Sequence, residues 1–358
     1  MKPLIALLFI ATSLSAQTFQ RFVAIDNVCA WPNLTLMPDG SINTTIFGQP
    51  SHGQMPGAAE CWNSKDGQFW EKRGIPAPND PHTNRMNVAA GLAKNGDLLV
   101  LCAGWTDIKE PESPKQSAFR DFILAPWVCR SSDGGRTWTQ IKAFPAPDAG
   151  WTNYIPFGDI KVGEDGALHV SCYGGELKDK IKLGMKTKSM RSWHYRSDDD
   201  GKTWARTSII HKTGNETTLL HLGGKRWLAA ARETAMDLFI SEDDGLTWGE
   251  PNRVTQKNEI NGHLARLKDG RIVLTYGNRI KTGNQLGVLA KFSSDEGKTW
   301  GEPIRVAHTT SWDCGYPSTV QRADGKLVTA WYAGASEYHA RYHMGVAIWD
   351  APPAAETK

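Results

Sequence analysis

An eight-residue pattern that returns along the chain constrains its fold more than any other feature. The pattern is Ser-x-Asp-x-Gly-x-Thr-Trp, with a weaker copy at Asn63–Trp70 and four full copies that end at Trp138, Trp204, Trp248 and Trp300. In such a box the Ser and Asp side chains hold backbone N–H groups of a tight turn, glycine supplies the positive φ, and tryptophan packs between neighbouring sheets. The last three tryptophans lie 44 and 52 residues apart. That spacing is typical of β-propeller blades.

A second repeat lies upstream of each box and predicts a β-hairpin. It consists of an apolar run, a turn such as Asp-Gly, and another apolar run. Its six turns centre on Gly40, Gly96, Gly166, Gly224, Gly270 and Gly325. We expect each hairpin to form the two inner strands of a blade, and the run before each box to form the third.

The sixth hairpin lacks a box and is followed by a last apolar run that ends at Val346–Trp349. We expect the early strand Phe19–Ile25 to complete this blade and so close the ring without a free edge. The sequence therefore predicts an all-β fold, a six-bladed β-propeller of four-stranded antiparallel blades.

The first residues predict export. Lys2 precedes an almost wholly apolar run from Leu4 to Leu14, and small residues follow up to Ala16. This order is typical of a signal peptide, and the run is too short to span a membrane comfortably. We expect a signal peptide at 1–16, a propeller at 17–352 and a tail at 353–358, in a secreted or periplasmic protein.

The six cysteines divide into two groups. Four lie inside apolar runs, which predicts small buried hydrophobic side chains: Cys61, Cys102, Cys129 and Cys172. Cys29 and Cys314 each stand three residues before a proline that opens an inner strand. Because an exported protein can form disulfides, we predict that these two approach one another and are bridged.

The repeated boxes resemble the Asp-boxes of the sialidase superfamily, whose propellers have six blades, and the match covers nearly the whole chain. The resemblance implies a site at the propeller axis with a tyrosine nucleophile and a glutamate that takes its proton. It also implies an arginine cluster for the substrate carboxylate and an aspartate acid/base. A phenol suits this reaction because the anomeric carbon carries a carboxylate, which would repel an attacking Asp or Glu.

Four positions of this chain match that set. Tyr316 stands eight residues before the turn of the sixth hairpin, as the sialidase tyrosine does, and Glu216 opens the fourth hairpin, where sialidases place its partner. Arg232 and Arg279 end the fourth and fifth hairpins. The resemblance implies that these two arginines hold an anionic group, because a guanidinium pairs bidentately with a carboxylate.

Two departures change the expected substrate. Sialidases begin their first blade with Arg-Ile-Pro, whereas this chain has Trp31 between Ala30 and Pro32, which predicts a stacking surface for a sugar. Residues 41–65 contain no aspartate, so we expect His52 or Glu60 to be the acid/base. Both departures argue against strict specificity for sialic acid.

Further residues near the ends of the inner strands are candidates for substrate binding. They are polar or aromatic: Arg85, Asn87, Trp105, Asp159, Tyr173, Asn261, His263 and Asp313. No His, Cys or Asp cluster has the spacing of metal ligands, and the acidic run at 198–201 lacks a twelve-residue calcium loop. We therefore expect neither a metal nor a cofactor.

The sequence favours a sialidase-like exo-glycoside hydrolase that acts on an acidic sugar. One alternative is a polysaccharide lyase on uronic acids, because β-elimination also uses a histidine, a tyrosine and arginines that neutralise a carboxylate. The other is a glycan-binding propeller without turnover.

The 41 basic and 38 acidic residues nearly balance, which argues against nucleic acid or an anionic membrane as a partner. We expect a monomer that binds carbohydrate.

Overall fold

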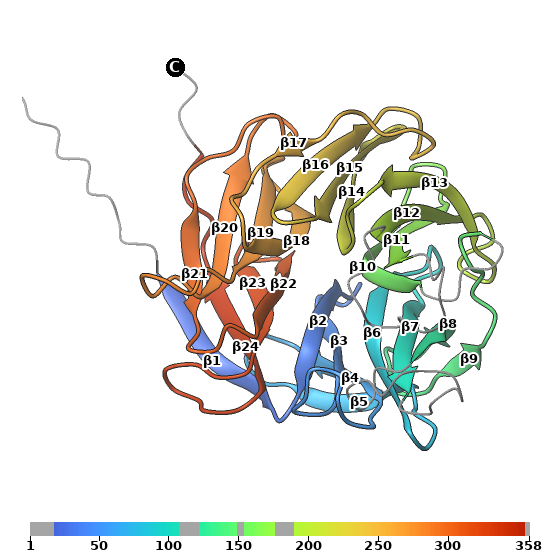
Figure 1. Cartoon of the computed structure of the whole chain (residues 1–358), viewed down its shortest axis with the longest axis horizontal. Helices are drawn as coiled ribbons and strands as arrows, with labels where there is room; N and C mark the ends of the chain where they lie inside the picture. The colour runs from blue at the N-terminus through green and yellow to red at the C-terminus, as the bar shows by residue number, and fades with distance from the viewer. Residues whose placement is uncertain (1–17, 107–121, 149–153, 176–189, 355–358) are drawn as a thin grey trace, which may run out of the picture.

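The regular elements of the described chain are all β-strands, arranged around a central axis (Figure 1). The computed structural model describes residues 18–106, 122–148, 154–175 and 190–354. The predicted signal peptide lies outside these residues, as do the last four positions of the predicted tail. The described strands build an all-β propeller whose blades are antiparallel and four-stranded.

The strands follow one another in groups of four, and the last group takes its fourth strand from the beginning of the chain. The first three groups are β2 (Cys29–Leu36), β3 (Ile42–Phe47), β4 (Ala59–Ser64) and β5 (Glu71–Ala77); β6 (Thr83–Leu92), β7 (Leu98–Thr106), β8 (Phe122–Ser131) and β9 (Thr139–Ile141); and β10 (Ile155–Val162), β11 (Leu168–Gly175), β12 (Met190–Ser197) and β13 (Ala205–His211). The others are β14 (Thr217–Gly223), β15 (Arg226–Arg232), β16 (Met236–Ser241) and β17 (Asn252–Arg253); β18 (Glu259–Arg266), β19 (Ile272–Asn278), β20 (Gly287–Ser293) and β21 (Ile304–His308); and β22 (Cys314–Gln321), β23 (Leu327–Ala333), β24 (His343–Trp349) and β1 (Phe19–Asp26).

Two neighbouring groups are joined into one eight-stranded sheet, which the sequence did not predict. The inner strands β6 and β10 pair in parallel, with Gly158 opposite Ala89 and Ile160 opposite Gly91. A Cβ added to Gly91 would lie 2.2 Å from the carbonyl oxygen of Ile160, so no larger residue fits there. The glycine thus lets the two inner strands come close enough to exchange hydrogen bonds.

The ring is closed by the two ends of the described chain. β1 pairs antiparallel with β24, from Phe19 opposite Trp349 to Asp26 opposite His343. This pairing confirms the prediction that the early strand completes the last blade. Because β1 covers the outer side of β24, the edge strand of this blade is β1.

Each box forms the turn that its residues predict. In the box that ends at Trp300, the Ser293 hydroxyl accepts the Gly297 N–H at 2.8 Å, and Asp295 accepts the Thr299 N–H at 2.8 Å. Trp300 Nε1 donates to the Gly297 carbonyl at 3.0 Å, and Gly297 has a φ of 87°. The serine, aspartate and tryptophan of this box are thus used within the turn, which confirms that the box is structural.

The predicted bridge between Cys29 and Cys314 is wrong, since no disulfide joins them in the structure. Both side chains are fully buried, but they belong to different apolar clusters. Cys314 packs with Leu267 and Trp331, whereas Cys29 lies in the cluster that holds Tyr316. Equivalent positions in adjacent blades therefore do not bring the two sulfur atoms together. The other four cysteines are buried, as predicted.

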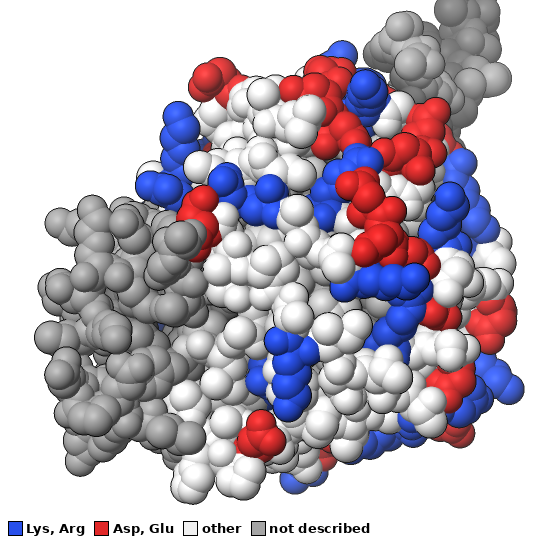
Figure 2. Space-filling model, turned by 90° about the vertical axis from the view of Figure 1, so that its right-hand side faces the viewer, with Lys and Arg blue, Asp and Glu red and all other residues white. Residues whose placement is uncertain are grey.

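The surface carries charges of both signs. Figure 2 shows basic and acidic side chains interspersed on one side of the molecule, with no large area of a single sign among the described residues. This mixture agrees with the near-balance of basic and acidic residues in the sequence. Among the same residues there is no helix that is long and apolar enough to cross a membrane.

Candidate functional site

Tyr316 lies near the start of the inner strand β22 in a backbone conformation that few residues adopt. Its φ is 49°, in the left-handed region that costs energy for an aromatic residue, and Gly315 before it has a φ of 104°. The pairing of β22 with β23 shifts register between Gly315 and Ser318. A Cβ on Gly315 would lie 3.1 Å from Gly277 Cα in the neighbouring blade. The bulge and the two glycines together turn the Tyr316 side chain toward its partners.

The Tyr316 hydroxyl is held by a carboxylate and a guanidinium. It donates to Glu216 Oε1 at 2.5 Å and accepts from Arg232 Nη1 at 3.0 Å. Arg232 also forms an ion pair with Glu216 Oε2, and Asn261 Nδ2 donates to the same oxygen at 2.7 Å. Glu216 thereby has its Oε2 occupied by two donors and its Oε1 reserved for the phenol. The predicted residues Tyr316, Glu216, Arg232 and Asn261 form one cluster.

The electrostatics of this cluster keep the phenol protonated at rest. Burial raises the pKa of Tyr316, the Glu216 charge raises it further, and Arg232 and Arg279 lower it in part. Burial lowers the pKa of Arg232, but the charge of Glu216 and the hydrogen bond to it raise the pKa more, so this side chain stays cationic. A phenol with a raised pKa attacks only if a base takes its proton during the attack. Glu216 is placed to be that base.

A second group of polar side chains surrounds Asp313. Arg279 donates to the Cys314 carbonyl and to the Tyr332 hydroxyl, both at 2.9 Å. Tyr332 in turn donates to Asp313 Oδ1 at 2.6 Å, and Tyr342 donates to Asp313 Oδ2 at 2.5 Å. The Arg279 guanidinium also lies 5.4 Å from the centre of the Tyr316 ring. Arg279 and Tyr332 therefore link the Asp313 group to the Tyr316 group.

His52 completes the Asp313 group, with Nδ1 at 2.8 Å from Asp313 Oδ1. Burial raises the pKa of Asp313. The hydrogen bond and charge of His52 and the hydrogen bonds from Tyr332 and Tyr342 lower it more, so the pKa of Asp313 is below its usual value. An ionised carboxylate can only accept hydrogen bonds, so His52 Nδ1 carries the proton of this contact.

Trp31 lies between the two groups. Its ring is 4.9 Å from Tyr316 and 5.6 Å from His52, in an edge-on arrangement with each. The indole is 9% exposed, so it packs against both side chains more than it faces solvent. Trp31 therefore fixes the separation of the tyrosine from the histidine and presents only a narrow edge for stacking.

The structure removes two predicted residues from the site. Glu60 lies on β4 and is bound to Lys72 at 2.5 Å and to Trp62 Nε1 at 3.0 Å, so its carboxylate is used by the outer strands. The Arg85 guanidinium stacks on Trp127 and donates to backbone carbonyls within its own blade. Position near a strand end predicted both, but the direction of a side chain depends on the pleat and the bulges of the strand.

Asp159 and His263 lie deeper along the axis than predicted. Both are in the middle of an inner strand, and His263 Nε2 is 3.0 Å from Asp159 Oδ2. Lys161 Nζ is 2.6 Å from the same oxygen. Asp159 and Lys161 line a cavity that Tyr316 does not reach. His263 and Tyr316 both line a second, smaller cavity. Asp159, His263 and Lys161 form a polar network that is separate from the hydrogen bonds around the Tyr316 hydroxyl.

The remaining predicted binders border the central aromatic cluster. Trp105 packs against the cluster that contains Trp31 and Tyr316, and Tyr173 packs in an adjoining cluster with Phe157. Asn87 is buried, and its Oδ1 has no hydrogen-bond partner among the described residues. Trp105 and Tyr173 thus form part of the aromatic packing around the site.

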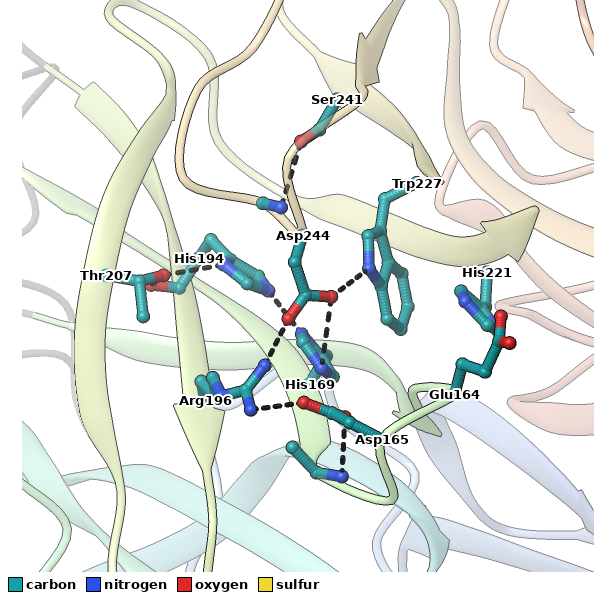
Figure 3. Close-up of polar contacts among 12 residues, drawn as sticks. Glu164, Asp165, His169, His194, Arg196, Thr207, His221, Trp227, Ser241 and Asp244 are labelled. Carbon is teal, nitrogen blue, oxygen red and sulfur yellow. Dashed lines mark hydrogen bonds and ion pairs between the residues drawn. The ribbon is translucent and has the colours of Figure 1, made fainter. Parts of the chain in front are cut away.

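A cluster outside this site has the composition of a metal centre, contrary to the sequence prediction. Ligand atoms of Asp165, His169 and Asp244 lie within 4.8 Å of one another (Figure 3). Sequence spacing did not reveal it because the residues come from two blades. However, Arg196 already bridges the two carboxylates, with a contact to Asp165 at 2.5 Å and another to Asp244.

The neighbouring blade shows what this arrangement does. Arg130 and Arg196 each precede the serine of their own box, and each pairs with an aspartate in the box of the next blade, Asp200 or Asp244. In the earlier blade Leu99 stands where His169 stands, so no imidazole is available there. Because the same arginine link forms with and without the histidine, we interpret the cluster as an ionic link between blades.

Comparison with known proteins gives a family match over the middle of the chain. Residues 108–329 match the family described as BNR repeat-like domain. A curated relative, a sialidase of Micromonospora viridifaciens, is 23% identical over 301 residues, which cover 75% of this chain and 44% of the relative. The chain therefore spans less than half the length of that protein.

Solved structures with the same fold include proteins with and without a described activity. A Dyadobacter fermentans protein of unknown function has a TM-score of 0.76 at 20% identity and covers 93% of this chain and 99% of its own. The NanB sialidase of Streptococcus pneumoniae has a TM-score of 0.68 at 12% identity, with 92% and 70% covered. A Hadza microbial sialidase has a TM-score of 0.66 at 18% identity, with 88% and 64% covered. At these identities the likeness concerns the fold alone.

Proposed function

The chain belongs to the BNR repeat-like domain family, in the sialidase superfamily of β-propellers, and from this premise we propose that it is an exo-acting glycoside hydrolase. Its proposed substrate is an acidic sugar at the end of an extracellular or periplasmic glycan. The observation that carries the proposal is the 2.5 Å hydrogen bond from the Tyr316 hydroxyl to Glu216, held in a buried cluster with Arg232. A tyrosine that only packs against its neighbours needs no carboxylate at its hydroxyl.

In the proposed mechanism the Tyr316 oxygen attacks the anomeric carbon while its proton passes to Glu216. The bond to the glycosidic oxygen breaks, and that oxygen takes a proton from His52, which Asp313 orients. Water then attacks the glycosyl–tyrosine bond, gives its proton to His52 and releases the sugar, and Glu216 returns its proton to the phenolate. Arg232 and Arg279 supply the positive charge that an anionic substituent on the sugar requires.

The surroundings of the site are part of the same proposal. We interpret the eight-stranded sheet as two blades, so that the propeller has six. We also propose that the protein is exported and acts as a monomer, which fits the closed ring and the signal-like start of the sequence.

The first experiment is a screen of the purified protein on a panel of acidic glycans, with mass analysis of the products. Release of a saturated acidic monosaccharide supports the proposal. A product with a new double bond, absorbing in the ultraviolet, would instead identify a lyase. Binding without any product would identify a glycan-binding propeller.

The Tyr316→Phe variant tests the role of the phenol. We expect turnover to fall by about two orders of magnitude or more, because the nucleophile is lost, while the thermal melt stays close to that of the wild type. The matched control is Tyr276→Phe, which removes a buried hydroxyl that has no hydrogen-bond partner among the described residues. This control should keep its activity. A folded Tyr316→Phe protein with wild-type turnover would refute the mechanism.

A further inference from the structure

A cavity lies at the opposite end of the propeller axis from Tyr316. All six inner strands around the axis contribute to it: β2, β6, β10, β14, β18 and β22 (Figure 1). Trp31 and Tyr316 are the third residues of β2 and β22, whereas the last three residues of the same strands line the cavity, Leu34–Leu36 and Thr319–Gln321. Because a strand rises about 3.3 Å per residue, about 10 Å or more of strand separates the two places. The cavity is therefore separate from the Tyr316 cluster.

The walls of this cavity carry more positive than negative charge. Its volume is about 520 Å³, within the range of small-molecule sites. Three cationic side chains line it: Lys161, Arg266 and Lys268. Among its described lining residues the one carboxylate is Asp159, which is already held by Lys161 at 2.6 Å and by His263 at 3.0 Å. A cleft with an excess of one sign of charge attracts a ligand of the opposite sign.

The protein itself compensates the charges of Arg266 and Lys268 only weakly. Arg266 Nη2 donates to the Leu222 carbonyl at 3.3 Å and lies 3.8 Å from Glu296 Oε1. Glu296 is bound more closely by Arg226, at 2.6 Å. Lys268 Nζ donates to a backbone carbonyl at 2.8 Å and forms no ion pair with any residue that the structure describes. Both side chains therefore keep donors for a ligand.

Other walls of the cavity are apolar. Leu36 and Val162 line it, and each is 38% exposed, while Leu220 and Val320 add further apolar surface. Large apolar side chains that are exposed together beside a cavity favour a ligand with an apolar surface of its own. The cavity thus combines a cationic part with an apolar part.

We propose that this cavity is a second ligand site, for a small organic molecule that carries an oxyanion group on an apolar body. The oxyanion is a carboxylate or a phosphate and pairs with Arg266 and Lys268, while the apolar body contacts Leu36 and Val162. Arg266 suits both groups, because a planar guanidinium can donate two parallel hydrogen bonds to either. The site goes beyond the proposed hydrolase function, since it needs neither Tyr316 nor turnover.

The test is an NMR titration of the whole protein, labelled at its leucine and valine methyl groups, with three probes of similar size. Benzoate carries a carboxylate, phenyl phosphate carries a phosphate, and benzyl alcohol is neutral. We expect at least one anion to shift the methyl signals of Leu36 and Val162 in a saturable manner, and benzyl alcohol to bind at least about tenfold more weakly. The anion that binds more tightly identifies the oxyanion that the site prefers.

Charge-removing variants test the predicted contacts. Arg266→Gln should weaken binding of the preferred anion about tenfold, and Lys268→Gln about threefold, because each removes a cationic donor. The matched control is Lys65→Gln, which removes an exposed lysine from the box at Asn63–Trp70 and should bind as the wild type does.

Three results would each overturn the inference: no saturable shift with either anion, equally tight binding of benzyl alcohol, or unchanged anion binding in Arg266→Gln. Because the measurement reports binding alone, a glycan screen without turnover would count against the hydrolase and not against this site.

Discussion

At the scale of single residues, Glu216 is the side chain on which the site depends. Its two oxygens receive three donors, from Tyr316, Arg232 and Asn261. The carboxylate is 5% exposed, so water does not compete freely for these bonds. A buried carboxylate with one oxygen saturated and the other facing a phenol is suited to take one proton and to return it.

The shared role of Glu216 and Tyr316 predicts that their losses do not add. We expect Glu216→Gln to lower turnover about as much as Tyr316→Phe, by about two orders of magnitude, and the double variant to be little worse than either. Single-turnover rates of the three variants, on the substrate from the screen, measure this. Losses that multiply would mean that the two residues act independently, as they would if Tyr316 only packed against the sugar.

The sequence predicted the Tyr316 group but only part of the Asp313 group. Tyr316, Glu216 and Arg232 were found because each stands at a fixed place in a hairpin. Tyr332 stands near the end of the second strand of its hairpin, as Trp105 and Tyr173 do, so the same rule was available but was not extended to the sixth hairpin. Tyr342 precedes the third strand of the last blade, and nothing in the sequence shows that its hydroxyl reaches Asp313.

At the scale of elements, one blade replaces part of its apolar packing with a pair of histidines. His169 Nδ1 lies 2.9 Å from His194 Nε2, and both side chains are fully buried. The preceding blade has Leu99 and Val128 at the matching positions. Burial is the main cause that lowers the pKa of both histidines to about 3. The charge of Arg196 lowers the pKa of His169 further, and His169 lowers the pKa of His194 further. The 3.8 Å contact of His169 with Asp244 is therefore not an ion pair at neutral pH.

This pair predicts a pH-dependent stability. A histidine whose pKa is lower when folded stabilises the fold above its unfolded pKa of about 6.5, and this stability is lost as pH falls toward 3. We expect the wild type to lose about 2 kcal/mol or more between pH 7 and pH 5 relative to the double variant His169→Leu/His194→Val, which copies the preceding blade. Urea unfolding at both pH values measures the difference. Parallel pH curves for the two proteins would contradict this prediction.

The strands themselves were predictable because the repeats mark both ends of each blade. A box sets the end of the third strand, and an Asp-Gly turn sets the join of the inner two. The parallel pairing of β6 with β10 was not predictable, because it depends on how closely two blades approach at Gly91. Such a distance is set by packing around the whole ring, which no local pattern records.

At the scale of the whole molecule, the last blade depends on a strand from the other end of the chain. β1 supplies the outer partner of β24, and Phe19 stacks on Trp349 at 5.4 Å. Arg21 Nε also donates to the carbonyl of Val306 in the neighbouring blade. β1 therefore joins two blades as well as completing one.

Removal of Phe19–Asp26 tests this dependence. We expect the truncated protein to melt at least about 10 °C lower or to aggregate, because β24 loses its partner and exposes an edge. Thermal melts and size-exclusion chromatography measure both outcomes. A synthetic peptide with the sequence of β1, added in trans, should restore part of the loss, and a scrambled peptide should not. A truncated monomer with the wild-type melting temperature would show that β1 is dispensable.

The closing pair also sets an order of events during synthesis. β1 leaves the ribosome long before β24, and at about 5–20 residues per second the interval is tens of seconds. Throughout that time β1 has an apolar side and lacks its partner β24. Each blade that emerges in between has an edge strand with which β1 could pair incorrectly. The ring can be completed only after β24 has emerged, so a prematurely terminated chain cannot close the propeller around the site.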